Sequence, residues 1–152
     1  MKARLTTLLM FAGQAEAAMR FYTSLVPDAE LERIEHYGAG EPGAAGTVKH
    51  AVLRLGGQRL ICIDSPVAQP FTFTPAMSLV LVVDTRPELE RLYDGLAQGG
   101  QVLMALGAYP FNPWFGWVTD RYGVSWQLSL DIVPPPEPPS PDTVAEPPTA
   151  AL

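Results

Sequence analysis

The chain has 152 residues, of which 47% are hydrophobic, and its formal net charge is −6. This length and apolar content fit one domain with a substantial core, and the scattered Lys and Arg residues argue against a nucleic-acid partner or an anionic membrane surface, which need a basic patch. No run reaches the roughly 18–20 apolar residues of a membrane-spanning helix. The single cysteine, Cys62, cannot form an intrachain disulfide, so we expect a cytoplasmic protein without a membrane partner.

The N-terminal residues fit two interpretations. Lys2 and Arg4 precede a short apolar stretch, as in a secretory signal. The same stretch fits a first strand whose side chains alternate between two faces. We favour the strand, because the apolar region is short and includes Thr6 and Thr7.

Residues 1–132 form the expected domain, and its elements follow one order twice. In the first half, a strand, a helix and three further strands are expected at residues 4–11, 14–25, 30–37, 48–55 and 59–63. Apolar residues from Ala18 to Leu25 recur at helical spacing. Gly56 and Gly57 predict a tight hairpin between the last two strands.

The second half repeats this order. Strands are expected at residues 78–83, 101–106, 115–119 and 125–130. Thr85, with Glu88 three residues later, has the pattern of a capping box that opens a helix, and Gly99 ends it. The segment AYPFNPWFG, residues 108–116, is expected to be a mobile loop held by its two prolines. The sequence therefore predicts an α+β fold in which helices cover one sheet face and leave the other free for a cleft.

The last twenty residues, 133–152, differ in composition from the domain. Eight of the sixteen prolines lie there, without a Lys, an Arg or an aromatic residue. Such a segment cannot bury enough apolar surface to offset its ordering entropy, so we expect an extended or disordered tail. A proline-rich ligand for another domain is the alternative.

Three segments carry more specific motifs: FAGQAEAAMRFYTSL at residues 11–25, KHAVLRLGGQRLICIDS at 49–65 and FGWVTDRYGVSWQL at 115–128. Together they resemble the PhnB-like branch of the vicinal oxygen chelate superfamily, which includes glyoxalases and bleomycin-resistance proteins. The resemblance implies two paired βαβββ modules that form a half-open mixed barrel with helices outside, and a homodimer. Members are often named 3-demethylubiquinone-9 3-methyltransferase-like. The chain has no glycine-rich strand-to-helix turn for a methyl-donor nucleotide, so methyl transfer is not expected.

The resemblance also implies four positions for a metal site. Metal-dependent members of the superfamily bind the ion through His and Glu, and the corresponding residues here are Thr7, Cys62, Ser78 and Gln127. Two hydroxyls, one carboxamide and one thiol are a poor ligand set for a catalytic divalent ion. We therefore expect no metal and no cofactor, and we assign these residues to the pocket of a small organic ligand.

A general base, if there is one, comes from His36, His50 or a carboxylate. Strand alternation places His50 and Arg54 on the open face of their strand. Arg54 would favour an anionic or enolate ligand, or it pairs with Asp64 or Glu35. His50 would be the base, or a histidine bonded to a neighbour.

Two further features leave alternatives open. Cys62 is either a nucleophile activated by a cation or, as its apolar neighbours favour, an inert core thiol. Phe115 and Trp117 are expected to face the cleft, and the nearby Phe111 and Trp114 add to the aromatic density. These rings would wall a pocket for a planar or apolar ligand, form a dimer contact or belong to the core.

Two functions from different classes remain. The first is a metal-independent protein that binds a small organic molecule without converting it, as bleomycin-resistance-type proteins do. The alternative is an isomerase, lyase or transferase that acts next to a carbonyl, with His50 as base and Arg54 as anion stabiliser. A third interpretation is a dimeric structural or regulatory protein whose pocket is vestigial.

Overall fold

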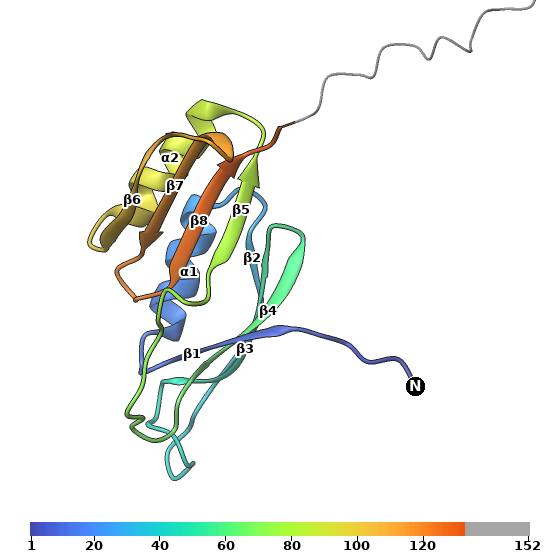
Figure 1. The fold of residues 1–152 in the computed structure, drawn as a ribbon. Coiled ribbons are helices and arrows are strands. Elements are labelled where there is room, and N and C mark those ends of the chain that lie inside the picture. Colours follow the sequence, from blue (N-terminus) through green and yellow to red (C-terminus); the bar gives the residue numbers. More distant parts are fainter. Residues whose placement is uncertain (133–152) are drawn as a thin grey trace, which may run out of the picture.

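The computed structural model describes residues 1–132 and has the element order expected from the sequence (Figure 1). The first module consists of β1 (Thr7–Phe11), α1 (Ala15–Leu25), β2 (Glu30–His36), β3 (Val48–Leu55) and β4 (Gln58–Asp64). The second consists of β5 (Leu79–Val83), α2 (Arg86–Ala97), β6 (Gln101–Tyr109), β7 (Asn112–Thr119) and β8 (Ser125–Leu130). The expected α+β fold with two βαβββ modules is confirmed, and the tail at 133–152 lies outside the described residues.

Each module forms its own four-stranded mixed sheet. The strand orders are β1-β4-β3-β2 and β5-β8-β7-β6, and in each sheet the module's first strand runs parallel to its last. The sheets do not close into a barrel, because no ladder joins β1 to β5 within residues 1–132. Both of these strands are therefore sheet edges, and they flank the seam between the modules.

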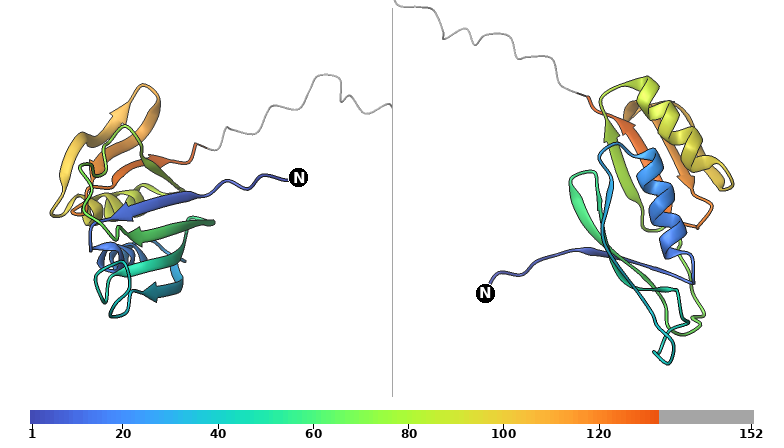
Figure 2. Two further views of the ribbon diagram at one scale, coloured as in Figure 1. Left: turned by 90° about the horizontal axis from the view of Figure 1, so that it is seen from below. Right: turned by 180° about the vertical axis from the view of Figure 1, so that it is seen from behind.

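The two helices lie side by side on one side of the molecule (Figure 2, right). They pack closely because Gly95 of α2 has no side chain, and a Cβ there would lie 2.7 Å from a methyl of Leu25 in α1. Arg91 of α2 donates to the Leu25 carbonyl at 2.7 Å. This contact ties one module to the other and leaves the opposite faces of the sheets uncovered by helices. No helix among the described residues is long and apolar enough to cross a membrane.

A buried carboxylate explains the closing motif of the sequence. Asp120, 3% exposed, lies between β7 and β8. One of its oxygens accepts hydrogen bonds from the Tyr122 and Val124 amides, and the other from the Tyr22 hydroxyl at 2.5 Å and the Trp126 indole at 2.8 Å. A buried acceptor with four donors is well satisfied. Since Tyr22 belongs to α1, the motif holds the two modules together.

Asp64 has a similar role within the first module. It is buried, and it accepts hydrogen bonds from the amides of Gly13, Ala15 and Val48 at 2.8–3.0 Å. These bonds join the end of β4 to the start of α1 and of β3. The carboxylate satisfies amides at the helix N-terminus, which have no partner inside the helix.

Two local expectations were wrong. Thr85 is the N-cap of α2, but its side chain makes no capping hydrogen bond, and Glu88 pairs with Arg91 at 2.7 Å. Segment 108–116 is not a loop: β6 and β7 continue to a two-residue turn, with Tyr109 paired to Asn112. Asn112 anchors this hairpin by donating to the Leu130 carbonyl at 3.0 Å.

The glycine hairpin of the first module forms as expected. Leu55 pairs with Gln58, so Gly56 and Gly57 are the two turn residues. Their φ angles are +58° and +80°, as a type I′ turn requires at both central positions. The turn brings Gly56 near Leu81 of the second module.

Candidate ligand-binding site

The open face of the second sheet carries the polar side chains of the candidate site. Leu81, Leu128 and Val118 are buried on the helix side of the sheet. The residues that precede and follow them in each strand point to the opposite, open face of the sheet. Val80 and Trp117 both lie opposite Gln127 in the ladders, so these three side chains share the open face.

Trp117 and Gln127 form a connected, uncharged hydrogen-bond network with Ser78 and Ser125. The hydroxyls of Ser78 and Ser125 are 2.7 Å apart. The Trp117 indole donates to Ser125 at 2.8 Å, and the Gln127 amide donates to Ser78 at 3.3 Å. Ser125 is only 2% exposed. Nothing local in the sequence signals the contact of Ser125 with Ser78, which lies 47 residues away.

Two cavities meet at Ser78. A cleft of about 490 Å³ lies between β5 and the β3–β4 hairpin, and its wall includes Thr7, Gly56 and Gln58. A smaller cavity of about 210 Å³ lies at the start of β5. Its lining residues are Leu9, Phe73, Thr74, Met77, Ser78, Leu79, Val124 and Ser125. Each of the residues found to line these two cavities is uncharged, so this seam is a neutral site.

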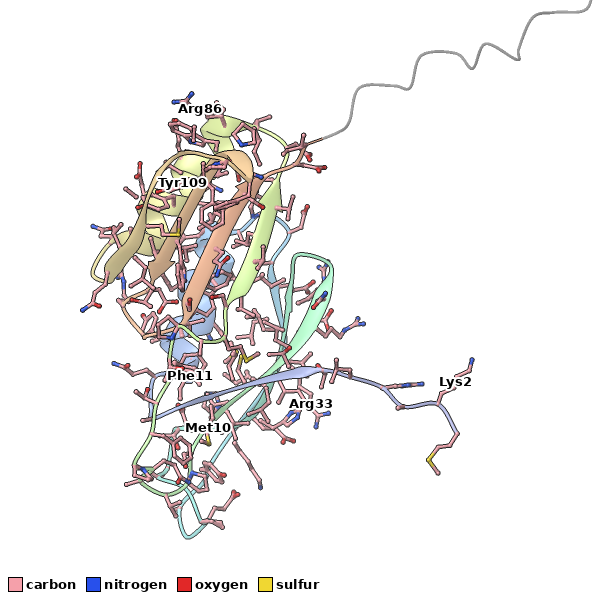
Figure 3. The ribbon with its side chains drawn as sticks, in the orientation of Figure 1. Lys2, Met10, Phe11, Arg33, Arg86 and Tyr109 are labelled. Atoms are coloured by element: carbon pink, nitrogen blue, oxygen red, sulfur yellow. The ribbon has the colours of Figure 1, made fainter. Side chains whose placement is uncertain are left out.

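Thr7 and Cys62 do not join Ser78 and Gln127 on an open face. Thr7 pairs with Leu60 and Cys62 with Leu9, and these partners are buried. Thr7 borders the larger cleft, but Cys62 lines neither cavity. The expected convergence of four side chains is therefore incomplete. Neighbouring strand residues point to opposite faces, as Met10 and Phe11 do (both labelled in Figure 3), so a one-residue error in motif spacing selects the wrong face.

Cys62 has the properties of a core thiol. It is fully buried, and the loss of solvent, followed by the charge of Asp64, raises its pKa to about 12. A thiol that stays protonated near neutral pH is a weak nucleophile. The structure thus supports the inert role rather than the place in a ligand pocket.

His50 and Arg54 lie on the outward face of β3, away from the neutral site. Arg54 binds Glu30 at 2.7 Å and Glu32 at 3.3 Å, instead of the expected Asp64 or Glu35. Its hydrogen bond to Glu30 raises the pKa of the guanidinium. Neither His50 nor Arg54 lines the two cavities. The two side chains are four residues apart on one strand, or about 13 Å.

The aromatic residues divide between the two sides of the second sheet. Phe115 shares the open face with Trp117 but is largely covered by its neighbours, with Phe111 at 4.9 Å and Tyr109 at 5.8 Å between ring centroids. Trp114 lies under the Arg86 guanidinium, 3.4 Å from the ring centroid, and Figure 3 labels Arg86 and Tyr109 at the same end of the sheet. Trp117 alone joins the polar network.

The donor set at the site does not fit the divalent ion that the superfamily resemblance implies. Ser78, Ser125, Gln127 and Trp117 offer two hydroxyls, a carboxamide and an indole N–H. Catalytic zinc sites use His, Glu, Asp or Cys. Across residues 1–132, no group of three or more such side chains is arranged to hold an ion.

The fold and the comparisons agree on the class of protein. A glyoxylase/bleomycin resistance protein/dioxygenase domain from Frankia sp. EAN1pec has the same fold, with a TM-score of 0.61 at 17% identity over 87% of this chain and 94% of its own. The chain is thus a protein of the vicinal oxygen chelate fold. Residues 3–129 match the model of the 3-demethylubiquinone-9 3-methyltransferase family, and the chain belongs to this family.

A relative with a solved structure confirms the resemblance to the PhnB-like branch. A PhnB protein from Bacillus cereus is 52% identical over 85% of this chain and all of its own, with a TM-score of 0.81. Protein YjdN of Escherichia coli K12 is 26% identical over 83% of this chain and 94% of its own. The three sequence motifs therefore identified the family correctly.

Proposed function

We propose that the chain is a metal-independent protein that binds a small organic molecule at the seam between its two sheets. The observation that carries the proposal is the uncharged network of Ser78, Ser125, Gln127 and Trp117 beside two cavities. Ligand pockets combine apolar walls with a few fixed polar groups, and this seam has that composition.

Binding without conversion fits the absence of a proton-transfer group at the seam. Among the described residues that line the cavities, none is a His, Asp, Glu, Lys or Arg. A serine hydroxyl without an adjacent base is a weak nucleophile. The family name describes a methyltransferase, but removing a proton from an acceptor hydroxyl would need a base that this lining does not provide.

The enzyme alternative requires His50 and Arg54 to act together. Arg54 is already neutralised by Glu30 and Glu32, which leaves His50 without a cationic partner for an enolate. A His50→Ala variant separates the hypotheses. We expect it to retain ligand affinity, with no turnover in either form. Turnover in the parent that is lost in the variant would favour the enzyme.

A thermal-shift screen tests the main proposal. We expect the midpoint of unfolding to rise saturably with at least one uncharged organic metabolite, because a ligand that binds only the folded state stabilises it by mass action. We expect no rise with Zn²⁺, Mn²⁺ or Ni²⁺ and no loss with a chelator. Elemental analysis that finds one tightly held ion per chain would contradict metal independence.

We also propose a homodimer, with a second copy covering the open sheet faces. Leu8 of β1, Val80 and Val82 of β5 are 50%, 58% and 58% exposed. Apolar side chains gathered on exposed sheet edges mark an interaction surface. Sedimentation should give a dimer that Val82→Lys converts to a monomer, while Leu5→Lys, in the exposed N-terminal segment, leaves it intact. A parent chain that sediments as a monomer at all concentrations would contradict this.

A further inference from the structure

The hydrogen bonds of the seam leave one serine hydrogen without an acceptor. Ser125 accepts from Trp117, and Ser78 accepts from Gln127. The two serines together have two hydroxyl hydrogens, and the 2.7 Å contact between them uses one. No other described residue accepts the second hydrogen. The pair therefore keeps one donor free, on whichever serine accepts within the pair.

The free hydrogen lies where a ligand would enter. Both serines line the smaller cavity, and Ser78 also borders the larger cleft. Because Ser125 is almost fully buried, a donor left there without an acceptor is costly. A ligand oxygen that accepts this hydrogen would remove the cost.

The remaining walls determine the charge of that ligand. Leu9, Phe73, Met77 and Val124 give the smaller cavity apolar sides. A charged group placed there would lose its hydration without gaining a partner of opposite sign. An uncharged group with an acceptor oxygen avoids this loss.

We propose that the seam selects an uncharged carbonyl compound, whose apolar part occupies the smaller cavity and whose oxygen accepts a hydrogen bond from the Ser78–Ser125 pair. This inference rests on the proposed binding function and specifies its ligand class. It requires no cofactor and no change of bonding in the ligand.

Three probes of similar shape test the inference in the full-length chain. Acetophenone is neutral with a carbonyl oxygen, ethylbenzene lacks the oxygen, and benzoate is anionic at neutral pH. Titration by NMR or calorimetry should give acetophenone about tenfold tighter binding than ethylbenzene, the effect of one hydrogen bond. Benzoate should bind more weakly than acetophenone.

Serine variants test the source of that preference. The Ser78→Ala/Ser125→Ala double variant removes both hydroxyl hydrogens, so it should reduce the acetophenone preference to about twofold or less. Each single variant leaves one serine whose hydrogen has lost its acceptor within the pair, so it should retain most of the preference. Ser129→Ala is the matched control, because Ser129 lies on the same face of β8, opposite Phe115. It should leave the preference unchanged. If the double variant fails to fold, the probe series in the parent chain still decides.

Each contrary result has a distinct meaning. Equal affinity for acetophenone and ethylbenzene, tighter binding of benzoate, or a lack of binding by all three probes overturns the carbonyl inference. If the metabolite screen nevertheless finds a saturable ligand, the binding function stands. If neither the screen nor the probes give binding, both proposals fail. A loss of the acetophenone preference in Ser129→Ala alone would place the ligand away from the Ser78–Ser125 pair.

Discussion

The two sheets have the same strand order but differ in the chemistry of their open faces. On the first, Arg54 and Arg59 alternate with Glu30 and Glu32 in a series of exposed ion pairs. On the second, Ser78, Ser125 and Gln127 form an uncharged network beside two cavities. The exposed charges are well solvated and satisfied by each other, whereas the network retains unused hydrogen-bonding capacity. The two sheets therefore share a strand order, but only the second has the features of a binding site.

The largest expected effect comes from breaking the link between the two modules. Asp120→Asn replaces one carboxylate oxygen with an amide N–H₂ that faces the Tyr22 hydroxyl and the Trp126 indole. Donors would then face donors in a buried place, so we expect a loss of about 3 kcal/mol in the free energy of unfolding. Urea denaturation measures this. Asp131→Asn, at an exposed position, is the control, and equal losses in both variants would contradict a special role for Asp120.

A second effect concerns alkaline stability. Burial raises the pKa of Cys62 from 9.0 to about 12, so between these values the unfolded chain releases a proton that the folded chain keeps. Stability is therefore unaffected below about pH 9 and falls as the pH rises above it, by up to about 1.4 kcal/mol per pH unit. Burial also raises the pKa of Tyr22, which acts in the same direction at higher pH.

Cys62→Ala should flatten this alkaline decline without removing the part that belongs to Tyr22. The measurement is urea denaturation at a series of pH values between about 8 and 11. The comparison is between slopes, since the cavity left by the smaller side chain lowers stability at every pH. An unchanged slope would mean that the thiol is accessible when folded.

A smaller effect is expected on the open face of the second sheet. Gln127→Leu removes the amide that donates to Ser78, which should loosen the serine pair. We expect about a tenfold loss of affinity for the ligand that the metabolite screen identifies, with little change in the fold because Gln127 is only half-buried. Calorimetric titration measures it. Full affinity in this variant would place the ligand elsewhere.

The smallest effect is expected on the first sheet. Arg54→Ala removes a guanidinium that is paired with Glu30 and Glu32 and does not touch the cavities. Exposed ion pairs contribute little, so ligand affinity should change by less than twofold in the same titration. A loss as large as that of Gln127→Leu would show that the charged face takes part in binding.

The sequence predicted the order of the elements well because their signals are local. Strand β8 was expected at residues 125–130 and occupies them, since its side chains alternate clearly. The hairpin at Gly56 followed from two adjacent glycines. The segment at Pro110 and Pro113 was misread, because its anchor is long-range: Asn112 donates to the Leu130 carbonyl of β8, 18 residues away.

The candidate site was only partly predictable for a related reason. Ser78, Trp117 and Gln127 were found through motif alignment and alternation. The contact between Ser78 and Ser125 depends on the parallel pairing of β5 with β8, which connects residues far apart in the chain. Thr7 depended on counting from the first helix across the turn after β1, and Cys62 on motif alignment along β4. In both places one residue decides the face.

The glycine turn of the first module has a consequence for how the binding cleft can change. Gly56 borders the larger cleft with main-chain atoms alone, at a φ of +58° that side-chain-bearing residues rarely adopt. The backbone therefore forms the rim of the cleft at this point. A residue with a side chain in place of Gly56 would strain the turn and narrow the opening of the cleft. Differences among relatives in the ligands that this cleft binds should therefore come from substitutions in β5, whose side chains can change without straining a turn.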